Sequence, residues 1–412
     1  MVPPKSRSSV RILSFMKIRG SVFALFILLV SFVFSFAGGS ADKPSANSRY
    51  LVFVGTYTTK TDSKGIYSLQ FDTATGKLSE LGVAAETPDP SWVAVYPSGK
   101  YLYAANEAGK ASTVSAFAVD AKSGKLTLLN HAPSLGEDPC YLSFDKTGKY
   151  VLVANYGSGT VAVFPVLADG RLGEHTALVK DQGATGPNKE RQEAPHAHWI
   201  ETSLDDRSVY VADLGLDRVL RYGFDATNGT LSTAPVQSNW SHSVLDLSAK
   251  LARGAGPRHA AFSRNGEMYV LGELQSTVTA FQMIGTDDFV PTVFQRISAL
   301  PKGFSGRNNA AEIALHPSGR FLYTSNRGND TIAVFNVQRR DGRLSLVANI
   351  PTGGKEPRHF AIDPSGNYLL AENQLSNNIV VFKIDLATGL LAPTGQVLDV
   401  PSPVDLTFVA TE

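Results

Sequence analysis

Cysteine is nearly absent from this sequence, and so is an excess of charge of either sign. Cys140 is the single cysteine in 412 residues, which excludes an internal disulfide framework. The formal net charge is +1, so the composition gives no indication of a nucleic-acid partner. Charged residues make up only 18% of the chain and hydrophobic residues 43%. This composition is too apolar for a disordered chain, and it is sufficient for a sizeable core.

The basic residues are concentrated at the N-terminus. Those that precede the first acidic residue, Asp42, are Lys5, Arg7, Arg11, Lys17 and Arg19. An apolar run from Ser21 to Ala37 follows them and ends in small residues. This pattern predicts that residues 1–41 are a secretory signal peptide or, if it is not cleaved, an N-terminal membrane anchor. Residues 42–49 would then be a linker.

The details of this export segment stay open. Ser35/Ala37 and Gly39/Ala41 are both suitable cleavage pairs, and Met16 is a second candidate start. Without the five basic residues, 33 lysines and arginines remain against 37 acidic residues, so the processed protein would be mildly acidic. We expect it in the periplasm, outside the cell, or anchored in the inner membrane. A buried N-terminal helix is the alternative, but it fits poorly with such one-sided charge.

The rest of the chain repeats one unit with a period of about 50 residues. Its clearest element is an aromatic and β-branched strand that ends in a small or amide residue. This element begins at Tyr50, Tyr101, Tyr150, Ser208, Glu267, Phe321 and Tyr368. Alternating polarity and glycine-containing turns predict antiparallel strands around each copy. The seven copies predict an all-β fold, a seven-bladed β-propeller over residues 50–412.

The two ends of the repeat array predict how the ring closes. Most units begin with a further strand that proline introduces, as in PRHFAIDPSG at 357–366, but the first unit lacks it. The C-terminus supplies a spare copy, PVDLTFVA, at 403–410. We therefore expect the C-terminal strand to complete the first blade, which removes the exposed edges of an open sheet. The rival fold is an open β-solenoid, which needs no exchange of strands between the termini.

Strand order in a propeller gathers distant residues on one face. The first strand of a blade lines the central channel and the second runs antiparallel to it, so first-strand starts and second-strand ends share a face. Starts of first strands carry His196, His198, Arg258, His259, Glu312, Arg358 and His359. Ends of second strands carry Asn106, Glu107, Asn155, Asp213, Glu273, Asn326, Arg327 and Asn373. The long connections at 174–194, 233–256 and 284–308 are expected to open onto this face and to wall a pocket.

Two interpretations apply to these polar residues. Asn and Asp at strand ends commonly satisfy turn backbone groups, and we favour that role for the amides and for Asp213. Histidine and arginine at three first-strand starts, in PHAH and twice in PRH, form a cationic ring that favours an anionic ligand. Arg258 and Arg358 are the candidates for binding it.

These same segments resemble the bacterial propeller-type 6-phosphogluconolactonase family, often called the lactonase family. The stretches that carry the resemblance lie at 186–200, 254–262, 310–335 and 356–374. The family is related to a fungal carboxy-muconate lactonising enzyme that uses a histidine, arginines and a glutamate at the propeller mouth. By motif position, these resemble His196, Arg258 and Glu273, with Arg327 or Arg358 as a further arginine. Gly272 stands where the family pattern has asparagine, which leaves the direction of the Glu273 side chain open.

The resemblance implies a lactone hydrolase that opens a sugar 1,5-lactone, phosphorylated or not, with activated water. Glu273 or His196 would be the base and Arg258 would stabilise the oxyanion. The substrate would be bound by Arg358, Arg327, Arg307, His198, His259, His359 and Glu312. We expect a monomer without a cofactor or a metal. His196 and His198 alternate on one strand, so a metal-dependent site is the alternative to the metal-free one.

Two other functions remain open at this stage. A propeller of this kind can bind a ligand or a protein without catalysis, or it can act as a lactonising cycloisomerase. No G-x-S-x-G motif stands out, so the sequence predicts no acyl-enzyme.

Overall fold

The computed structural model describes residues 49–232, 248–283 and 291–411. The predicted export segment and nearly all of the predicted linker lie outside these residues. None of the helices within them is long and apolar enough to cross a membrane.

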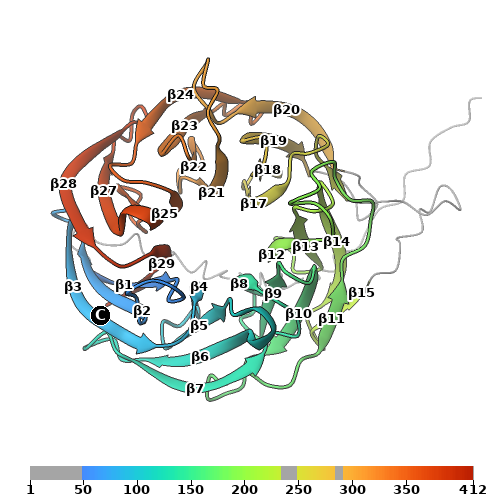
Figure 1. Ribbon diagram of the computed structural model, residues 1–412, viewed down its shortest axis with the longest axis vertical. Helices are drawn as coiled ribbons and strands as arrows, with labels where there is room; N and C mark the ends of the chain where they lie inside the picture. Colours follow the sequence, from blue (N-terminus) through green and yellow to red (C-terminus); the bar gives the residue numbers. More distant parts are fainter. Residues whose placement is uncertain (1–48, 233–247, 284–290, 412) are drawn as a thin grey trace, which may run out of the picture. The chain divides into compact units, whose positions relative to one another are not determined.

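The described chain forms seven antiparallel sheets arranged as the blades of a ring (Figure 1). From the innermost strand outward, the first three blades are β29 (Pro403–Ala410), β1 (Arg49–Thr56), β2 (Gly65–Asp72) and β3 (Lys77–Glu86); β4 (Pro90–Val95), β5 (Tyr101–Asn106), β6 (Thr113–Val119) and β7 (Leu126–Pro133); and β8 (Pro139–Phe144), β9 (Tyr150–Asn155), β10 (Thr160–Pro165) and β11 (Ala177–Lys180). The fourth and fifth are β12 (Ala197–Thr202), β13 (Ser208–Asp213), β14 (Arg218–Asp225) and β15 (Thr230–Ser232); and β17 (Pro257–Phe262), β18 (Glu267–Gly272), β19 (Thr277–Gln282) and β20 (Thr292–Ser298). The last two are β21 (Asn309–Leu315), β22 (Phe321–Arg327), β23 (Thr331–Val337) and β24 (Leu344–Pro351); and β25 (Pro357–Ile362), β26 (Tyr368–Asn373), β27 (Asn378–Ile384) and β28 (Leu391–Asp399).

Three short elements complete the fold. The two-residue strand β16 (Ala249–Lys250) pairs with β14, and the 3₁₀ turns η1 (Gly109–Ala111) and η2 (Gln374–Ser376) follow β5 and β26. Each of the seven predicted aromatic strands is the second strand of a blade, so the predicted propeller is confirmed. The prediction that three long ranges are connections without strands was wrong. The ranges 174–194, 233–256 and 284–308 contain the strands β11, β16 and β20, respectively.

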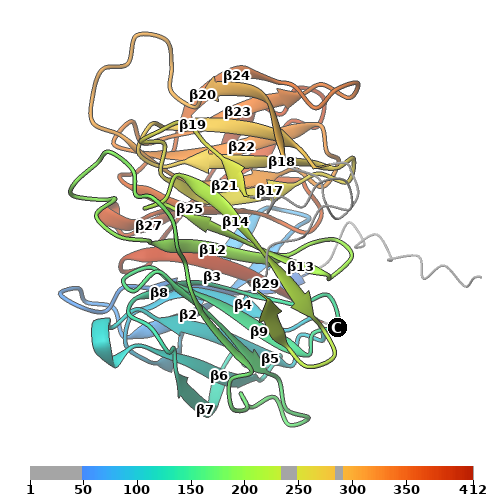
Figure 2. The same ribbon diagram turned by 90° about the vertical axis from the view of Figure 1, so that its right-hand side faces the viewer.

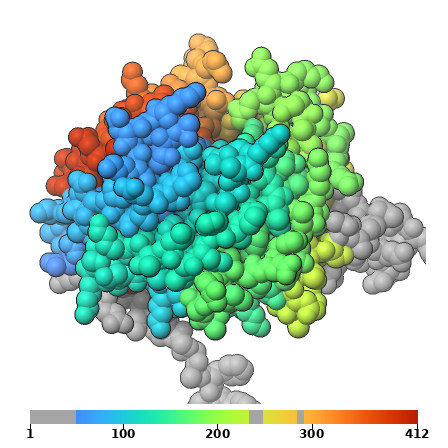
Figure 3. Space-filling view, turned by 60° about the horizontal axis from the view of Figure 1, so that its bottom comes forward, coloured from blue at the N-terminus to red at the C-terminus, as the bar shows by residue number. Residues whose placement is uncertain are grey.

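Closure of the ring by the C-terminal strand is confirmed. β29 pairs antiparallel with β1, from Tyr50 opposite Ala410 to Thr56 opposite Pro403. In the space-filling view, the blue first blade accordingly lies beside the red seventh blade and the cyan second blade (Figure 3). The open solenoid is excluded.

Neighbouring blades are joined by a repeated tyrosine contact as well as by apolar packing. The third residue of several second strands is a buried tyrosine whose hydroxyl donates to a glycine carbonyl in an outer turn of the next blade. These pairs are Tyr103 with Gly170 at 2.7 Å, Tyr269 with Gly342 at 2.7 Å and Tyr323 with Gly389 at 2.8 Å. The phenol ring therefore fills the apolar space between sheets while its polar end is satisfied.

Candidate active site

A bulge at the start of the innermost strands aims side chains into one end of the channel. The innermost strands run from one face of the ring to the other (Figure 2). In six of them the pairing with the second strand skips one residue, and such a bulge re-aims its side chain. The skipped residues are Ser91, Cys140, His198, Arg258, Arg358 and Val404. His198 and the two arginines thus occupy equivalent positions in three blades, whereas His196 lies just before its strand.

Glu273 is the centre of an arginine cluster at this end of the channel. It directly follows β18, and its side chain is only 3% exposed. Its Oε1 lies 2.7 Å from Nη2 of Arg191, and its Oε2 lies 3.0 Å from Nη2 of Arg327 and 3.2 Å from Nε of Arg258. Burial alone would raise the pKa of Glu273, but Arg327, Arg191 and Arg258 together hold this pKa well below its ordinary value. The carboxylate is therefore ionised, and both of its oxygens are occupied by guanidiniums.

Arg258 is fixed deep in the same cluster. The residue is 3% exposed, and its Nη1 donates to the carbonyl of Ala311 at 2.6 Å. Burial, together with the nearby Arg327 and Arg358, lowers the pKa of Arg258 to about 10. The guanidinium therefore remains charged at neutral pH in a place with little water, as stabilisation of an oxyanion requires.

A second group of polar and charged residues faces this cluster from the first, second and seventh blades. Arg358 donates through Nη2 to the hydroxyl of Tyr57 at 2.7 Å, and its guanidinium lies 5.2 Å from the centre of the Tyr57 ring. The Tyr57 hydroxyl in turn donates to Oε2 of Glu107 at 2.6 Å. Together with the Glu273 cluster, the site holds four guanidiniums and two carboxylates. The excess of positive charge favours an anionic ligand.

The two predicted histidines pack against one aromatic ring but have different neighbours. Tyr156 stacks on His196 with 4.5 Å between ring centres and meets His198 edge-on at 5.4 Å. Burial, and then Arg258, lower the pKa of His198 well below its ordinary value, while Glu273 opposes them. His198 is therefore a neutral ring beside the arginine cluster. Its Nδ1 lies 3.5 Å from Sγ of Cys140.

His196 lies closer to the rim. Its Nδ1 is 2.9 Å from the carbonyl of Tyr156, so this nitrogen must carry a proton. Its Nε2 lies 3.1 Å from Oε1 of Glu193, whose side chain is 55% exposed.

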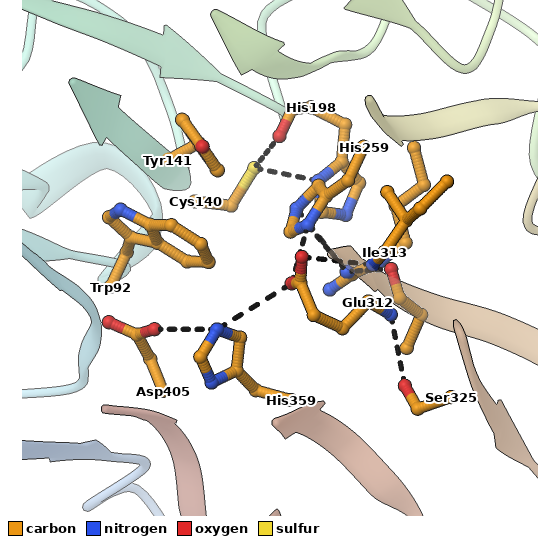
Figure 4. A network of polar contacts seen from close by, with 12 residues as sticks. Trp92, Cys140, Tyr141, His198, His259, Glu312, Ile313, Ser325, His359 and Asp405 are labelled. Carbon is orange, nitrogen blue, oxygen red and sulfur yellow. Dashed lines mark hydrogen bonds and ion pairs between the residues drawn. The ribbon is translucent and has the colours of Figure 1, made fainter. Parts of the chain in front are cut away.

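Of the remaining predicted residues, His259, Glu312 and His359 lie one layer deeper in the channel, where they contact each other (Figure 4). His259 Nδ1 is 2.7 Å from Oε2 of Glu312. His359 Nδ1 is 2.8 Å from Oε2 of Glu372, and its Nε2 is 3.3 Å from Oδ1 of Asp405. Burial raises the pKa of Glu312 and that of Asp405 to about 7, although His359 opposes this rise for both groups.

Below this layer the channel widens into a cavity of about 560 Å³. Glu312, His359 and Asp405 border it, and its walls are the later residues of the innermost strands, such as Phe144 and Ile362. Since Arg258 and Glu273 do not line it, this cavity opens at the other end of the channel from the arginine cluster.

The sequence interpretation missed several contributors to the site. Arg191 and Tyr156 were given no role, and Glu107 was noted only for its position at a strand end. Arg191 stands in the 186–200 stretch, so its basic charge beside the PHAH motif was an available signal. Tyr57 follows the first aromatic strand, as Glu107 and Tyr156 follow the next two. Arg307 is exposed and lies outside the buried cluster.

The sequence and the fold both match known proteins. Residues 51–408 match the family model described as lactonase, 7-bladed beta-propeller. The chain belongs to this lactonase family. A relative named 6-phosphogluconolactonase, from Bacillus subtilis, is 38% identical over 363 residues, which cover 88% of this chain and 99% of the relative. Lactonases of this family hydrolyse lactones, so the protein is a lactone hydrolase of the carboxylic-ester class.

Solved lactonase structures have the same fold. The periplasmic gluconolactonase of Pseudomonas aeruginosa superposes with a TM-score of 0.80 at 32% identity, covering 89% of this chain and all of the other. A structure described as a 6-phosphogluconolactonase homologue from Bacteroides fragilis gives 0.79 at 35% identity, with 89% of this chain and all of the other covered. Among the residues that the structure describes in this lactonase, no three His, Cys, Asp or Glu side chains are arranged to hold a metal ion.

Proposed function

We propose that this lactonase opens a sugar 1,5-lactone that carries a phosphate or a carboxylate group. The observation that carries the proposal is the charge of the site, in which four buried or half-buried guanidiniums face the carboxylates of Glu273 and Glu107. An anionic group of the substrate would balance the excess of positive charge. Arg358 and Arg327 are suited to bind it, because a planar guanidinium donates two parallel hydrogen bonds to phosphate or carboxylate.

His198 is our candidate for the general base. Both oxygens of Glu273 are occupied by guanidiniums, whereas Nε2 of His198 has no hydrogen-bond partner among the described residues. This nitrogen can therefore take a proton from the attacking water and return it to the departing alkoxide. Arg258 would stabilise the oxyanion of the tetrahedral intermediate. Glu273 would hold Arg191, Arg258 and Arg327 in place, rather than act as the base. His196 remains the alternative base, with its Nε2 lone pair available once Glu193 moves away.

A lactone panel tests the proposed function. We expect the protein without residues 1–41 to hydrolyse glucono-1,5-lactone 6-phosphate with a kcat/KM about 10–100 times that for the unphosphorylated lactone, because charge-assisted bidentate contacts favour the anion. A carboxylated aromatic-derived lactone completes the panel. Rates are measured as proton release, after subtraction of spontaneous opening in buffer.

Two arms of the same experiment separate the alternatives. Arg358→Lys keeps the charge but loses the planar fork, so it should reduce the preference for the anionic lactone more than it reduces turnover of the neutral one. Exhaustive chelation should leave all rates unchanged if the reaction is metal-free. Absence of turnover for every lactone, with ligand binding retained, would instead identify a binding protein.

We also propose that residues 1–41 export the protein to the periplasm, where they are cleaved or remain as an anchor. The one-sided charge before the apolar run supports this, and one structural relative is described as periplasmic. Cell fractionation should recover the protein in the periplasmic or membrane fraction, and replacing the five basic residues with neutral ones should retain it in the cytoplasm. Recovery of the unaltered protein from the cytoplasm alone would refute the assignment.

A further inference from the structure

The repeat contains a polar contact that joins most blades to the preceding one. Three second strands end in asparagine and a fourth, β22, has asparagine as its penultimate residue. Each of these amides donates to a carbonyl just after the outermost strand of the preceding blade. The contacts are Asn106 to Pro88 at 2.6 Å, Asn155 to Ser134 at 3.0 Å, Asn326 to Ala299 at 2.9 Å and Asn373 to Thr352 at 3.5 Å. These bonds are neutral, so they do not change with pH.

The fourth blade departs from this rule. Its second strand ends in Asp213, which pairs with Ala197 as Asn155 pairs with Pro139. A carboxylate cannot donate to a carbonyl. At the place of Ser134, directly after the outermost strand of the preceding blade, stands Asp181, and its carboxyl group lies close to that of Asp213. Both residues are 0% exposed.

We propose that Asp181 and Asp213 share one proton, and that this pair positions the histidine-bearing start of β12. The positioning contact is direct, because Oδ1 of Asp213 accepts the N–H of His196 at 2.9 Å and the N–H of Leu216 at 2.9 Å. The inference rests on the proposed function in so far as His198, two residues further along, is the base.

The surroundings of the pair require the proton. Oδ1 of Asp181 accepts the Tyr222 hydroxyl at 2.6 Å, and Oδ2 of each aspartate has no other donor within the described chain. The titratable groups that act on the pair are Tyr222 and His196, and neither is a lysine or an arginine. Two adjacent buried carboxylates without a cation cannot both ionise cheaply. One of them therefore stays protonated, and its O–H donates to the other.

The sign of the pH dependence follows from these contacts. Burial, and then the charge of Asp213, raise the pKa of Asp181 well above its ordinary value, and burial also raises the pKa of Asp213. The unfolded chain would bind the shared proton only in acid, whereas the folded chain keeps it at neutral pH. The stability due to the pair is thus complete in acid and is lost as pH rises through the folded-state pKa.

Asp181→Asn tests the shared proton, because its amide donates permanently to Asp213. The thermal midpoint of the wild type should fall by about 2–4 °C more than that of this variant between pH 6 and pH 9. Asp213→Asn restores the residue that four of the other blades use, so it should flatten the curve in the same way. Replacing the exposed Asp62 with asparagine is the control and should leave the curve parallel to the wild type. Parallel curves for the wild type and both pair variants would overturn the proposal.

Activity then tests the positioning role. The alkaline limb of kcat/KM should move up by about one pH unit in Asp181→Asn, which is a tenfold gain on that limb. If the alkaline limb of kcat/KM stays in place while the stability curve flattens, the pair does not position the histidine-bearing strand and this part of the proposal is wrong. If the wild type hydrolyses no lactone, the proposed function fails by itself, and the stability curves still decide whether the proton is shared.

Discussion

His198→Gln is expected to lower kcat by about 10²–10⁴-fold with little change in the thermal midpoint. Glutamine keeps a polar side chain of similar reach, but it cannot take a proton from water. His196→Gln is the matched comparison, two residues earlier in the same segment and against the same Tyr156 ring. It should lower kcat by less than about tenfold, because His196 has Tyr156 and Glu193 as its ring partners, away from the cluster.

Both variants are assayed on the best lactone of the panel, and their circular dichroism and thermal midpoints are compared with the wild type. A full pH profile is included, since loss of the base should remove the acidic limb of kcat. If His196→Gln shows the larger loss, the base is His196 and our assignment of His198 is wrong.

Removing residues 401–412 is expected to abolish cooperative folding of the propeller. The deletion takes away β29, the innermost strand of the first blade, and with it the pairing from Tyr50 to Thr56. It also removes buried Val404 and Leu406. Asp405, whose Oδ2 accepts the N–H of Val93 in the second blade at 2.6 Å, is lost as well. β1 would then present an unpaired edge in the channel wall.

The truncation is measured by differential scanning calorimetry and by resistance to limited proteolysis. Deletion of Thr411 and Glu412 alone is the control, because these residues follow β29. This deletion should lower the thermal midpoint only slightly. A truncated chain with an unchanged thermal midpoint would show that the ring is held closed by something other than β29.

The fold was predictable because its signal is repeated. Seven aromatic strands and one unpaired C-terminal copy specify both the number of blades and the mode of closure. The outermost strands were harder to predict because they are short, as ALVK at 177–180 is, or lie within long polar connections. Their pairing depends on the blade that they join and not on a pattern of their own.

The site was predictable only as a face of the ring. Arg258, Arg358 and Glu273 follow from their positions in the blades, but the choice between His196 and His198 depends on a bulge that strand alternation does not reveal. An alignment of residues 197–199 (AHW) with the two PRH segments at 257–259 and 357–359 could have indicated it, because His198 then occupies the position of the two arginines. The ion pair between Arg191 and Glu273 was not predictable, because a loop of the third-to-fourth blade connection must reach across to the fifth blade.

The shared first blade sets an order for events during biosynthesis. The strand that completes it, β29, is the last strand of the propeller to be made, yet its partner β1 is the first. The earlier blades can form local hairpins while the chain lengthens, but the ring cannot close until β29 has left the ribosome. A chain threaded through a membrane pore would complete the ring only on the far side, because β29 is the last strand of the propeller to arrive there.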